Sequence, residues 1–183
     1  RDEDLRADRQ PEFTQIDLEM SFVEREDVMQ MMTGFVKELW QSIFSYDIGT
    51  VQRMTWQHAM DRYGIDRPDT RYGLEIEDVS AIAAKTEFGV FKEALAKSRH
   101  GRNGVVRAIK VPGGAEKLTR KMTDAYSEWV KTFKAGGVPV VKLTEKGFET
   151  GIAKFLEPVK AELIAALDLK VGDAVLFAAD HWD

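Results

Sequence analysis

The sequence predicts an α+β protein, and three observations lead to that prediction. Apolar residues recur at helical spacing over 26–44 and again over 119–133. Short apolar runs over 105–111, 138–143 and 174–179 have the length and the β-branched content of strands. Helical and strand patterns then alternate through the second half of the chain, which is typical of a small sheet with helices packed on it.

The first stretch has two halves of opposite character. Residues 1–12 are mostly charged and include Pro11, so they predict an exposed loop. From Phe13 to Val23 polar and apolar residues alternate, which predicts a strand with one face on a core. The apolar face would hold Ile16, Leu18, Met20 and Phe22, and the polar face Gln15, Asp17, Glu19 and Ser21.

Two helices are predicted next. The first spans about 26–44, with Met and aromatic residues that we interpret as core packing rather than a cofactor site. The second is short, with Thr55 as N-cap and Gly64 as C-cap. The irregular segment 64–73 then holds Asp66, Asp69 and Arg71, which could form a local ion-pair latch or the wall of a pocket.

Beyond a predicted domain boundary near 74–79 the elements become shorter. We expect a helix over 77–85, a strand over 88–91, and a turn at 112–114 between the strand 105–111 and the helix 119–133. A strand over 138–143, a helix opened by Pro158 and a last strand over 174–179 complete the series.

The composition excludes several kinds of site and of protein. The chain has 183 residues, a net charge of −5 and no cysteine, so it holds neither disulfides nor thiolate metal sites. No apolar run has the length of a membrane span and no signal-peptide pattern is present, so we expect no membrane association and a cytoplasmic location. The histidines lack metal-ligand spacing, and we expect no metal site.

The negative net charge argues against general nucleic-acid binding, yet one segment is strongly basic. We call residues 92–121 the basic segment, because it contains nine basic residues and only two acidic ones, Glu93 and Glu116. The nine are Lys92, Lys97, Arg99, Arg102, Arg107, Lys110, Lys117, Arg120 and Lys121. This segment could attract the phosphates of a nucleic acid or could be an ordinary charged face.

The first residues carry a resemblance to a known family. The run RDEDLRADRQPEFTQIDLE resembles motif 2 of the class II aminoacyl-tRNA synthetases, in the form found in bacterial-type aspartyl-tRNA synthetases. The segment 64–73 is similar to the stretch that follows motif 2 in those enzymes, with Ile65, Arg67 and Thr70 in place of the usual residues. The resemblance implies two antiparallel strands joined by a long loop.

Residues 76–183 resemble the GAD insertion domain of the same enzymes. The matching pieces lie at 108–114, 118–121, 154–156, 171–173 and 176–180. The implied organisation is a partial class II catalytic domain over 1–75, built on an antiparallel sheet, followed by an α/β insertion domain over 76–183. Because motif 1, motif 3 and the anticodon-binding domain are not in this sequence, we interpret it as a fragment that is inactive alone.

The resemblance also implies site residues. Arg1 would stabilise the charge on the α-phosphate and touch the substrate carboxylate, while Asp2, Glu3 and Gln10 would join it in binding ATP. Gln15 and Asp17 would receive the aspartate. The alternation of 13–23 independently places these two on one face. The loop arginines, Arg6 and Arg9, would approach the acceptor end of tRNA or be solvated.

The implied activity of the parent protein is that of an aspartate–tRNA ligase. L-Aspartate, ATP and tRNA(Asp) would be its substrates, with tRNA(Asn) left open as a second acceptor, Mg²⁺ as a cofactor and a homodimer as the assembly. Two other hypotheses stay open at this point: a tRNA-binding module built on the GAD-like domain, and a non-catalytic synthetase paralogue. The motif 2 run favours the ligase, because neither alternative needs its site residues.

Overall fold

The computed structural model describes residues 10–182 and divides the chain into two compact units, 1–53 and 54–183. The predicted site residues Arg1, Asp2, Glu3, Arg6 and Arg9 lie outside the described residues. Across the helices of the described part, none combines the length and the apolar character that crossing a membrane requires.

Within the described residues of the first unit, the dominant element is the helix α1 (Arg25–Phe44). It begins where predicted, because Glu24 and Asp27 form a reciprocal capping box in which each side chain accepts from the other residue's backbone N–H. It ends at Ser45, whose backbone is left-handed. None of its residues is buried, so its apolar stripe packs against no core within this unit.

The strand predicted over Phe13–Val23 is wrong. In the described part of the first unit the backbone is irregular apart from an isolated bridge at Glu12 and the helix α1. The apolar side chains of the alternation are exposed, with Ile16 at 68% and Phe22 at 106%. An alternating sequence becomes a strand only beside a hydrogen-bonded neighbour, and the described sheets both lie in the second unit.

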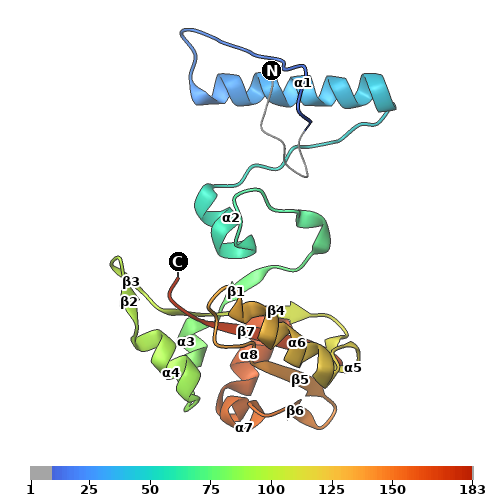
Figure 1. The fold of residues 1–183 in the computed structure, drawn as a ribbon. Helices are drawn as coiled ribbons and strands as arrows, with labels where there is room; N and C mark the ends of the chain where they lie inside the picture. The colour runs from blue at the N-terminus through green and yellow to red at the C-terminus, as the bar shows by residue number, and fades with distance from the viewer. Residues whose placement is uncertain (1–9, 183) are drawn as a thin grey trace. The chain divides into compact units, whose positions relative to one another are not determined.

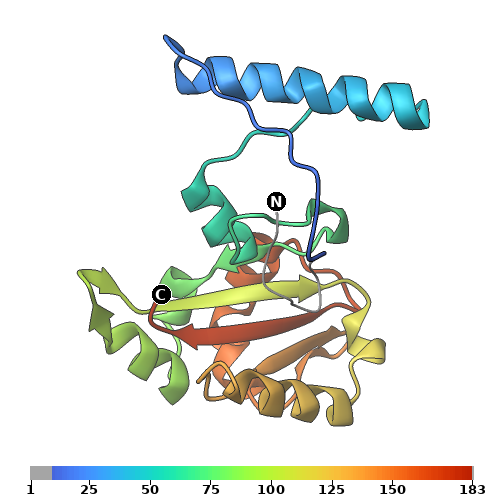
Figure 2. The same ribbon diagram turned by 45° about the horizontal axis from the view of Figure 1, so that its top comes forward.

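The second unit is an α+β fold built on a five-stranded antiparallel sheet, which confirms the predicted fold class (Figures 1 and 2). The strand order is β1-β4-β7-β5-β6. The strands are β1 (Ile76–Asp78), β4 (Val105–Val111), β5 (Val140–Thr144), β6 (Gly147–Glu149) and β7 (Ala174–Asp180). The central pair β4 and β7 runs in register from Val105 opposite Asp180 to Val111 opposite Ala174.

Helices supply the other half of the core. The central cluster joins sheet residues such as Val106, Val141 and Phe177 to helix residues such as Phe91 and Leu163, all nearly inaccessible to solvent. The helices and helical turns are α2 (Trp56–Tyr63), η1 (Thr70–Tyr72), α3 (Ser80–Ala83), α4 (Gly89–Ala96), α5 (Gly114–Lys117), α6 (Arg120–Lys131), α7 (Ala153–Leu156), η2 (Glu157–Val159) and α8 (Lys160–Leu167).

Two predictions near the start of the sheet need correction. The strand predicted over 88–91 is instead the start of α4, and the helix predicted over 77–85 is the strand β1 followed by the shorter α3. A short apolar run cannot separate strand from helix by its period. Here Phe88 and Phe91 lie one helical turn apart, and their rings contact edge to face with centroids 4.9 Å apart.

A small hairpin, absent from the sequence prediction, completes the unit. Its strands are β2 (Ser98–Arg99) and β3 (Arg102–Asn103), and it projects from the start of β4 beside α4 (Figure 1). The two turn residues, His100 and Gly101, have φ angles of 50° and 76°. Positive φ at both central residues is the geometry of a type I′ turn, which matches the twist of the two strands.

Candidate functional site

The predicted aspartate and ATP site is only partly within the described residues. Gln10, Gln15 and Asp17 are all exposed, in the irregular backbone that precedes α1. Gln15 and Asp17 are two positions apart, but the strand that was expected to hold them on one face is not formed. The cavities described below belong to the second unit and include none of the three residues.

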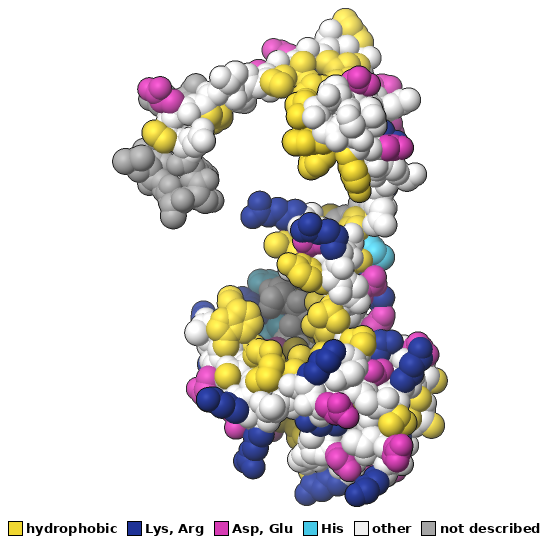
Figure 3. All heavy atoms as spheres, turned by 90° about the vertical axis from the view of Figure 1, so that its right-hand side faces the viewer, with side chains coloured by type: hydrophobic (Ala, Val, Ile, Leu, Met, Phe, Trp, Pro, Cys, Tyr) yellow, Lys and Arg dark blue, Asp and Glu magenta, His cyan; other side chains and the backbone are white. Residues whose placement is uncertain are grey.

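The most conspicuous surface of the first unit is the apolar stripe of α1. Figure 3 shows hydrophobic side chains gathered along this helix. Phe35, Leu39 and Trp40 are each about two-fifths exposed, and Ile43 is 62% exposed. At the start of the helix Arg53 forms an ion pair with Glu26, and its hydrogen bond lowers the pKa of that carboxyl group. The pair ties the chain after the helix back to its first turn.

In the second unit, an arginine clamp holds α2 against β1. Arg62 donates from Nε and Nη2 to the carboxylate of Glu75, at 2.9 and 2.6 Å, and forms a second ion pair with Glu77. Tyr63 adds a hydrogen bond to Glu75 at 3.2 Å. The Arg62 hydrogen bonds lower the pKa of Glu75, so its carboxylate stays ionised at neutral pH.

A second clamp joins α2 to β4 and to the chain end near Trp182. Asp61 accepts from the Trp182 indole at 3.0 Å, from Arg107 at 3.2 Å and from Gln57 at 2.8 Å. The hydrogen bond from Gln57, followed by those from Trp182 and Arg107, lowers the pKa of Asp61. Arg107 also pairs with Asp78 of β1 at 3.5 Å. Sequence reasoning missed this network because Asp61 and Trp182 are far apart in the chain.

The expected latch in segment 64–73 is confirmed for two of its three residues. Asp69 caps η1 by accepting from the Arg71 backbone N–H at 3.0 Å, and its carboxylate pairs with the Arg71 guanidinium. These hydrogen bonds lower the pKa of Asp69 to about 2. Asp66 is not among the residues of this pair, so the latch is a local one between neighbours two positions apart.

The basic segment is largely paired with acids from outside it. Lys92 pairs with Glu87, Lys97 with Asp180, Lys110 with Asp168 and Arg120 with Asp124. Arg107 belongs to the second clamp described above. These partners reduce the excess of positive charge that the sequence alone indicated. Two further members of the segment, Arg99 and Arg102, lie on the projecting hairpin β2–β3.

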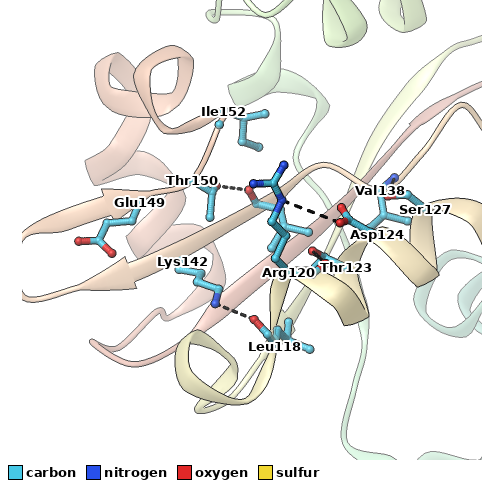
Figure 4. A pocket seen from close by; sticks show the side chains of 12 residues that line it. Leu118, Arg120, Thr123, Asp124, Ser127, Val138, Lys142, Glu149, Thr150 and Ile152 are labelled. Atoms are coloured by element: carbon cyan, nitrogen blue, oxygen red, sulfur yellow. Dashed lines mark hydrogen bonds and ion pairs between the residues drawn. The ribbon is translucent and has the colours of Figure 1, made fainter.

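The cavity drawn in Figure 4 lies between α6 and the strands β5 and β6, with a volume of about 590 Å³. Arg120 and Asp124 stand on its α6 side, and Thr150 stands opposite. Lys142 donates to the carbonyls of Ala115 and Leu118 at 2.7 and 2.6 Å. These two hydrogen bonds tie β5 to α5 and to the residue that follows it.

A smaller cavity of about 340 Å³ lies between α6 and the sheet and is almost entirely apolar. Tyr126, Trp129 and Val130 of α6 face Ile109 and Leu176 across it. It shows that α6 packs loosely against its side of the sheet. The residues of the described part contain no cluster of His, Asp and Glu that could hold a metal ion.

Comparisons with known proteins identify the family. The family model described as "tRNA synthetases class II (D, K and N)" matches residues 1–170. The Aspartate--tRNA ligase of Macrococcus caseolyticus (strain JCSC5402) is 48% identical over 184 residues, which cover 100% of this chain and 30% of the relative. That of Limosilactobacillus reuteri (strain DSM 20016) is 47% identical over 180 residues, or 98% of this chain and 29% of the relative.

A third relative, the Aspartate--tRNA ligase of Lactiplantibacillus plantarum (strain ATCC BAA-793 / NCIMB 8826 / WCFS1), is 45% identical over 185 residues, covering 100% of this chain and 30% of the relative. The chain therefore spans about 30% of the length of the relatives it matches. The resemblance to the class II aminoacyl-tRNA synthetases is confirmed by a match that runs through both structural units. This chain belongs to the class II tRNA synthetases (D, K and N).

Proposed function

We propose that the whole protein is an aspartate–tRNA ligase. The observation that carries the proposal is the identity of 45–48% to three proteins of that name, sustained over nearly the entire chain. Identity at this level through both the exposed first unit and the buried core of the second is more than a shared fold would require. The intact motif 2 run from Arg1 to Glu19 supports the same conclusion.

The reaction would proceed in two steps. An oxygen of the aspartate α-carboxylate attacks the α-phosphorus of ATP and pyrophosphate leaves, which gives aspartyl-adenylate. A ribose hydroxyl at the 3′ end of tRNA then attacks the activated carbonyl carbon, and AMP leaves. Neither step needs a protein nucleophile, because positioning of the reactants and stabilisation of the developing negative charge are sufficient.

Arg1 is the residue that we assign to charge stabilisation. A planar guanidinium grips two phosphate oxygens at once, so it suits the transition state at the α-phosphate better than a lysine would. We assign Asp2, Glu3 and Gln10 to ATP binding together with Arg1, with Glu3 facing the adenine amino group. Mg²⁺, held mainly by groups outside this chain, would neutralise the triphosphate.

Gln15 and Asp17 are the residues that we assign to the aspartate substrate, beside Arg1. The Asp17 carboxylate would pair with the α-ammonium group of the substrate, and the Gln15 carboxamide would add a hydrogen bond. Both side chains are exposed on the described segment. Their pairing on one face requires the segment to adopt the extended form that its alternating sequence favours.

The remaining features complete the proposal. The loop residues Arg6 and Arg9 would contact the acceptor end of tRNA(Asp), and of tRNA(Asn) if the enzyme charges both. Residues 1–75 would belong to the catalytic domain and 76–183 to a GAD-type insertion domain. The antiparallel sheet of the second unit suits such an insertion. The assembly would be a cytoplasmic homodimer.

The test is aspartate-dependent exchange of pyrophosphate into ATP by the whole protein, with Asp17→Ala compared against wild type. We expect robust exchange in the wild type and a loss of at least about 100-fold in the variant, because the substrate ammonium would lose its charged partner. Asp17→Asn keeps the shape of the side chain and removes the charge, so it should lose most of the exchange as well.

Glu38→Ala is the matched control. Glu38 is an exposed acid on α1, so its removal changes the net charge equally without touching the assigned site. Exchange should be unchanged in this control. A folded wild-type protein that shows no aspartate-dependent exchange would overturn the proposed function, whereas full activity in Asp17→Ala would overturn only the assignment of Asp17.

A further inference from the structure

The five-stranded sheet of the second unit carries apolar side chains on both of its faces. One face packs on the core through residues such as Val106 and Phe177. On the opposite face, the strand registers place apolar residues in one row across four neighbouring strands. The row consists, in order, of Ile76, Ile109, Leu176 and Val140. An antiparallel sheet with a solvated face normally places polar side chains there, so this row indicates a face that requires a cover.

The helix α6 lies over this row and covers it incompletely. None of the residues of α6 is buried. Tyr126 and Trp129 line the apolar cavity of about 340 Å³ together with Ile109 and Leu176, yet they remain 37% and 60% exposed. Ala178, beside the row on β7, is also exposed and lines the same space. The cavity therefore has a floor from the sheet and a wall from α6, and it opens to solvent near Trp129.

Hydrogen bonds hold α6 at the distance that leaves this space. The Val138 N–H donates to the Ser127 hydroxyl at 3.3 Å, which ties the middle of the helix to the chain that enters β5. The Lys142 ammonium donates to the Leu118 carbonyl at 2.6 Å, just before the helix begins. A shift of α6 toward the sheet would lengthen or bend these bonds. The cavity is therefore a property of the way in which α6 is anchored.

The lining limits what the cavity can hold. Its only charged residue is Arg107, and that guanidinium pairs with Asp61 at 3.2 Å and with Asp78 at 3.5 Å. A ligand with charged or strongly polar groups would leave them without partners among the apolar side chains, which is costly. Aspartate, ATP and a nucleobase are therefore poor ligands for this space. A buried water typically makes about three hydrogen bonds, so water is poorly accommodated as well.

The volume and the aromatic wall favour a ligand made of rings. Ligand pockets in proteins have volumes of about 300–1,000 Å³ and are lined mainly by apolar and aromatic side chains. A dry cavity of about 150 Å³ is enough for one benzene molecule, so about 340 Å³ suits a molecule of about two rings. The Trp129 ring stands at the opening, where Phe133 contacts it edge to face with centroids 5.0 Å apart.

We propose that this cavity binds a small, uncharged aromatic molecule of about two fused rings, held between the floor at Ile109 and Leu176 and the wall at Tyr126 and Trp129. The rings of the ligand would pack offset or edge to face against the indole and the phenol. They would also supply the partner atoms that the side chains around an empty space lack. The inference goes beyond the proposed ligase activity and does not depend on it.

The experiment is photolabelling of the whole protein with trifluoromethyl-phenyldiazirine, a small uncharged aromatic probe, followed by peptide mapping with mass spectrometry. Illumination releases dinitrogen from the diazirine, and the carbene that remains inserts into a neighbouring C–H or O–H bond. We expect labelling in 126–130 and 176–178 that saturates as the probe concentration rises and is prevented by excess naphthalene. Labelling of the exposed stripe of α1 should not saturate, and it serves as the internal reference.

Ala178→Phe is the test variant, because its ring would occupy the cavity while an exposed alanine contributes little to the core. Saturable labelling should fall at least about fivefold, since the space that the ligand needs is filled. Ala165→Phe adds the same ring at an exposed position of α8 outside the cavity and should leave labelling unchanged. Trp129→Ala should weaken competition by naphthalene about three- to tenfold, whereas Trp40→Ala on α1 should not change it.

Two results would overturn the proposal. Labelling of α6 that rises in proportion to the probe without saturation would show that the probe only partitions onto exposed apolar side chains. Equal saturable labelling in Ala178→Phe and Ala165→Phe would place the ligand elsewhere. If Ala178→Phe fails to fold, Trp129→Ala still decides the question, because that side chain is 60% exposed and its removal spares the core. Competition by naphthalene that is the same in Trp129→Ala and in the wild type would then contradict the assignment.

Discussion

The two structural units differ in where their apolar side chains go. In the second unit, Phe91, Phe177 and Leu156 are each at most 2% exposed and form one core with the central strands. In the described part of the first unit, α1 has no buried residue and its stripe is exposed. Burial of apolar surface is the main driving force of folding. The second unit should therefore supply most of the free energy of unfolding of this chain.

The largest expected effect comes from the core of the second unit. Phe91→Ala should lower the free energy of unfolding by about 3–5 kcal/mol, because it removes a fully buried ring and leaves a cavity between α4 and β7. Urea unfolding of this chain would measure it. Phe35→Ala on α1 is the matched control and should change the free energy of unfolding much less. Equal destabilisation by Phe91→Ala and Phe35→Ala would contradict the conclusion that, among the described residues, only the second unit has a buried core.

The next effect concerns the clamp that holds α2 on the sheet. Arg62→Ala should lower the free energy of local opening of α2 by about 1–2 kcal/mol. This value is modest because Glu75 and Glu77 are partly exposed to solvent, which screens the ion pairs. Amide hydrogen exchange would then accelerate in α2 while the amides of β4 and β7 stay protected. Uniform acceleration through the sheet would show that the clamp supports the whole unit instead.

The same clamp gives the second unit a pH dependence with a defined sign. The pKa of Glu75 is lowered in the folded state by Arg62, so the unfolded state binds more protons as the pH falls. This stability is fully present above the ordinary glutamate value of 4.5 and is lost as the pH falls through the lowered folded pKa. Urea unfolding across the acidic range should show that loss, and Arg62→Ala should reduce it.

The smallest effect is expected at the surface of the first unit. Arg53→Ala removes the ion pair with Glu26, in which both side chains are more than half exposed. Pairs of this kind gain little because water and salt screen them. Urea unfolding of the variant should therefore match wild type within error, and a clear loss of stability would show that the first unit contributes to the cooperative fold.

Local patterns predicted the longer helices α1, α2 and α6 well, because their signals are contained in adjacent residues. The capping positions of α2 and α6, Thr55 and Thr119, each accept from the backbone N–H three residues on, and both helices begin where the sequence indicates. The alternation over 13–23 was misleading for a different reason. A strand depends on a partner strand, and its own residues do not reveal whether that partner is present.

The same distinction explains what was missed near the hairpin. Its turn is encoded by only His100 and Gly101, and its strands lack the alternation that marks a half-buried sheet. The pairing of Arg99 with Arg102 follows from the register of that turn, and the stacking of Arg102 on Trp182 joins residues eighty positions apart. The candidate aspartate site could be named only from the resemblance, since its geometry depends on a strand that the described segment does not form.

The central claim is that the whole protein activates aspartate. The most direct measurement is pyrophosphate exchange into ATP by the whole protein with aspartate, asparagine or lysine, the three amino acids of the matched family. We predict strong exchange with aspartate and at least about 100-fold less with the other two, since a site built for a carboxylate rejects an amide or an ammonium group. Exchange that is strongest with asparagine or lysine, or absent with all three, would contradict the account.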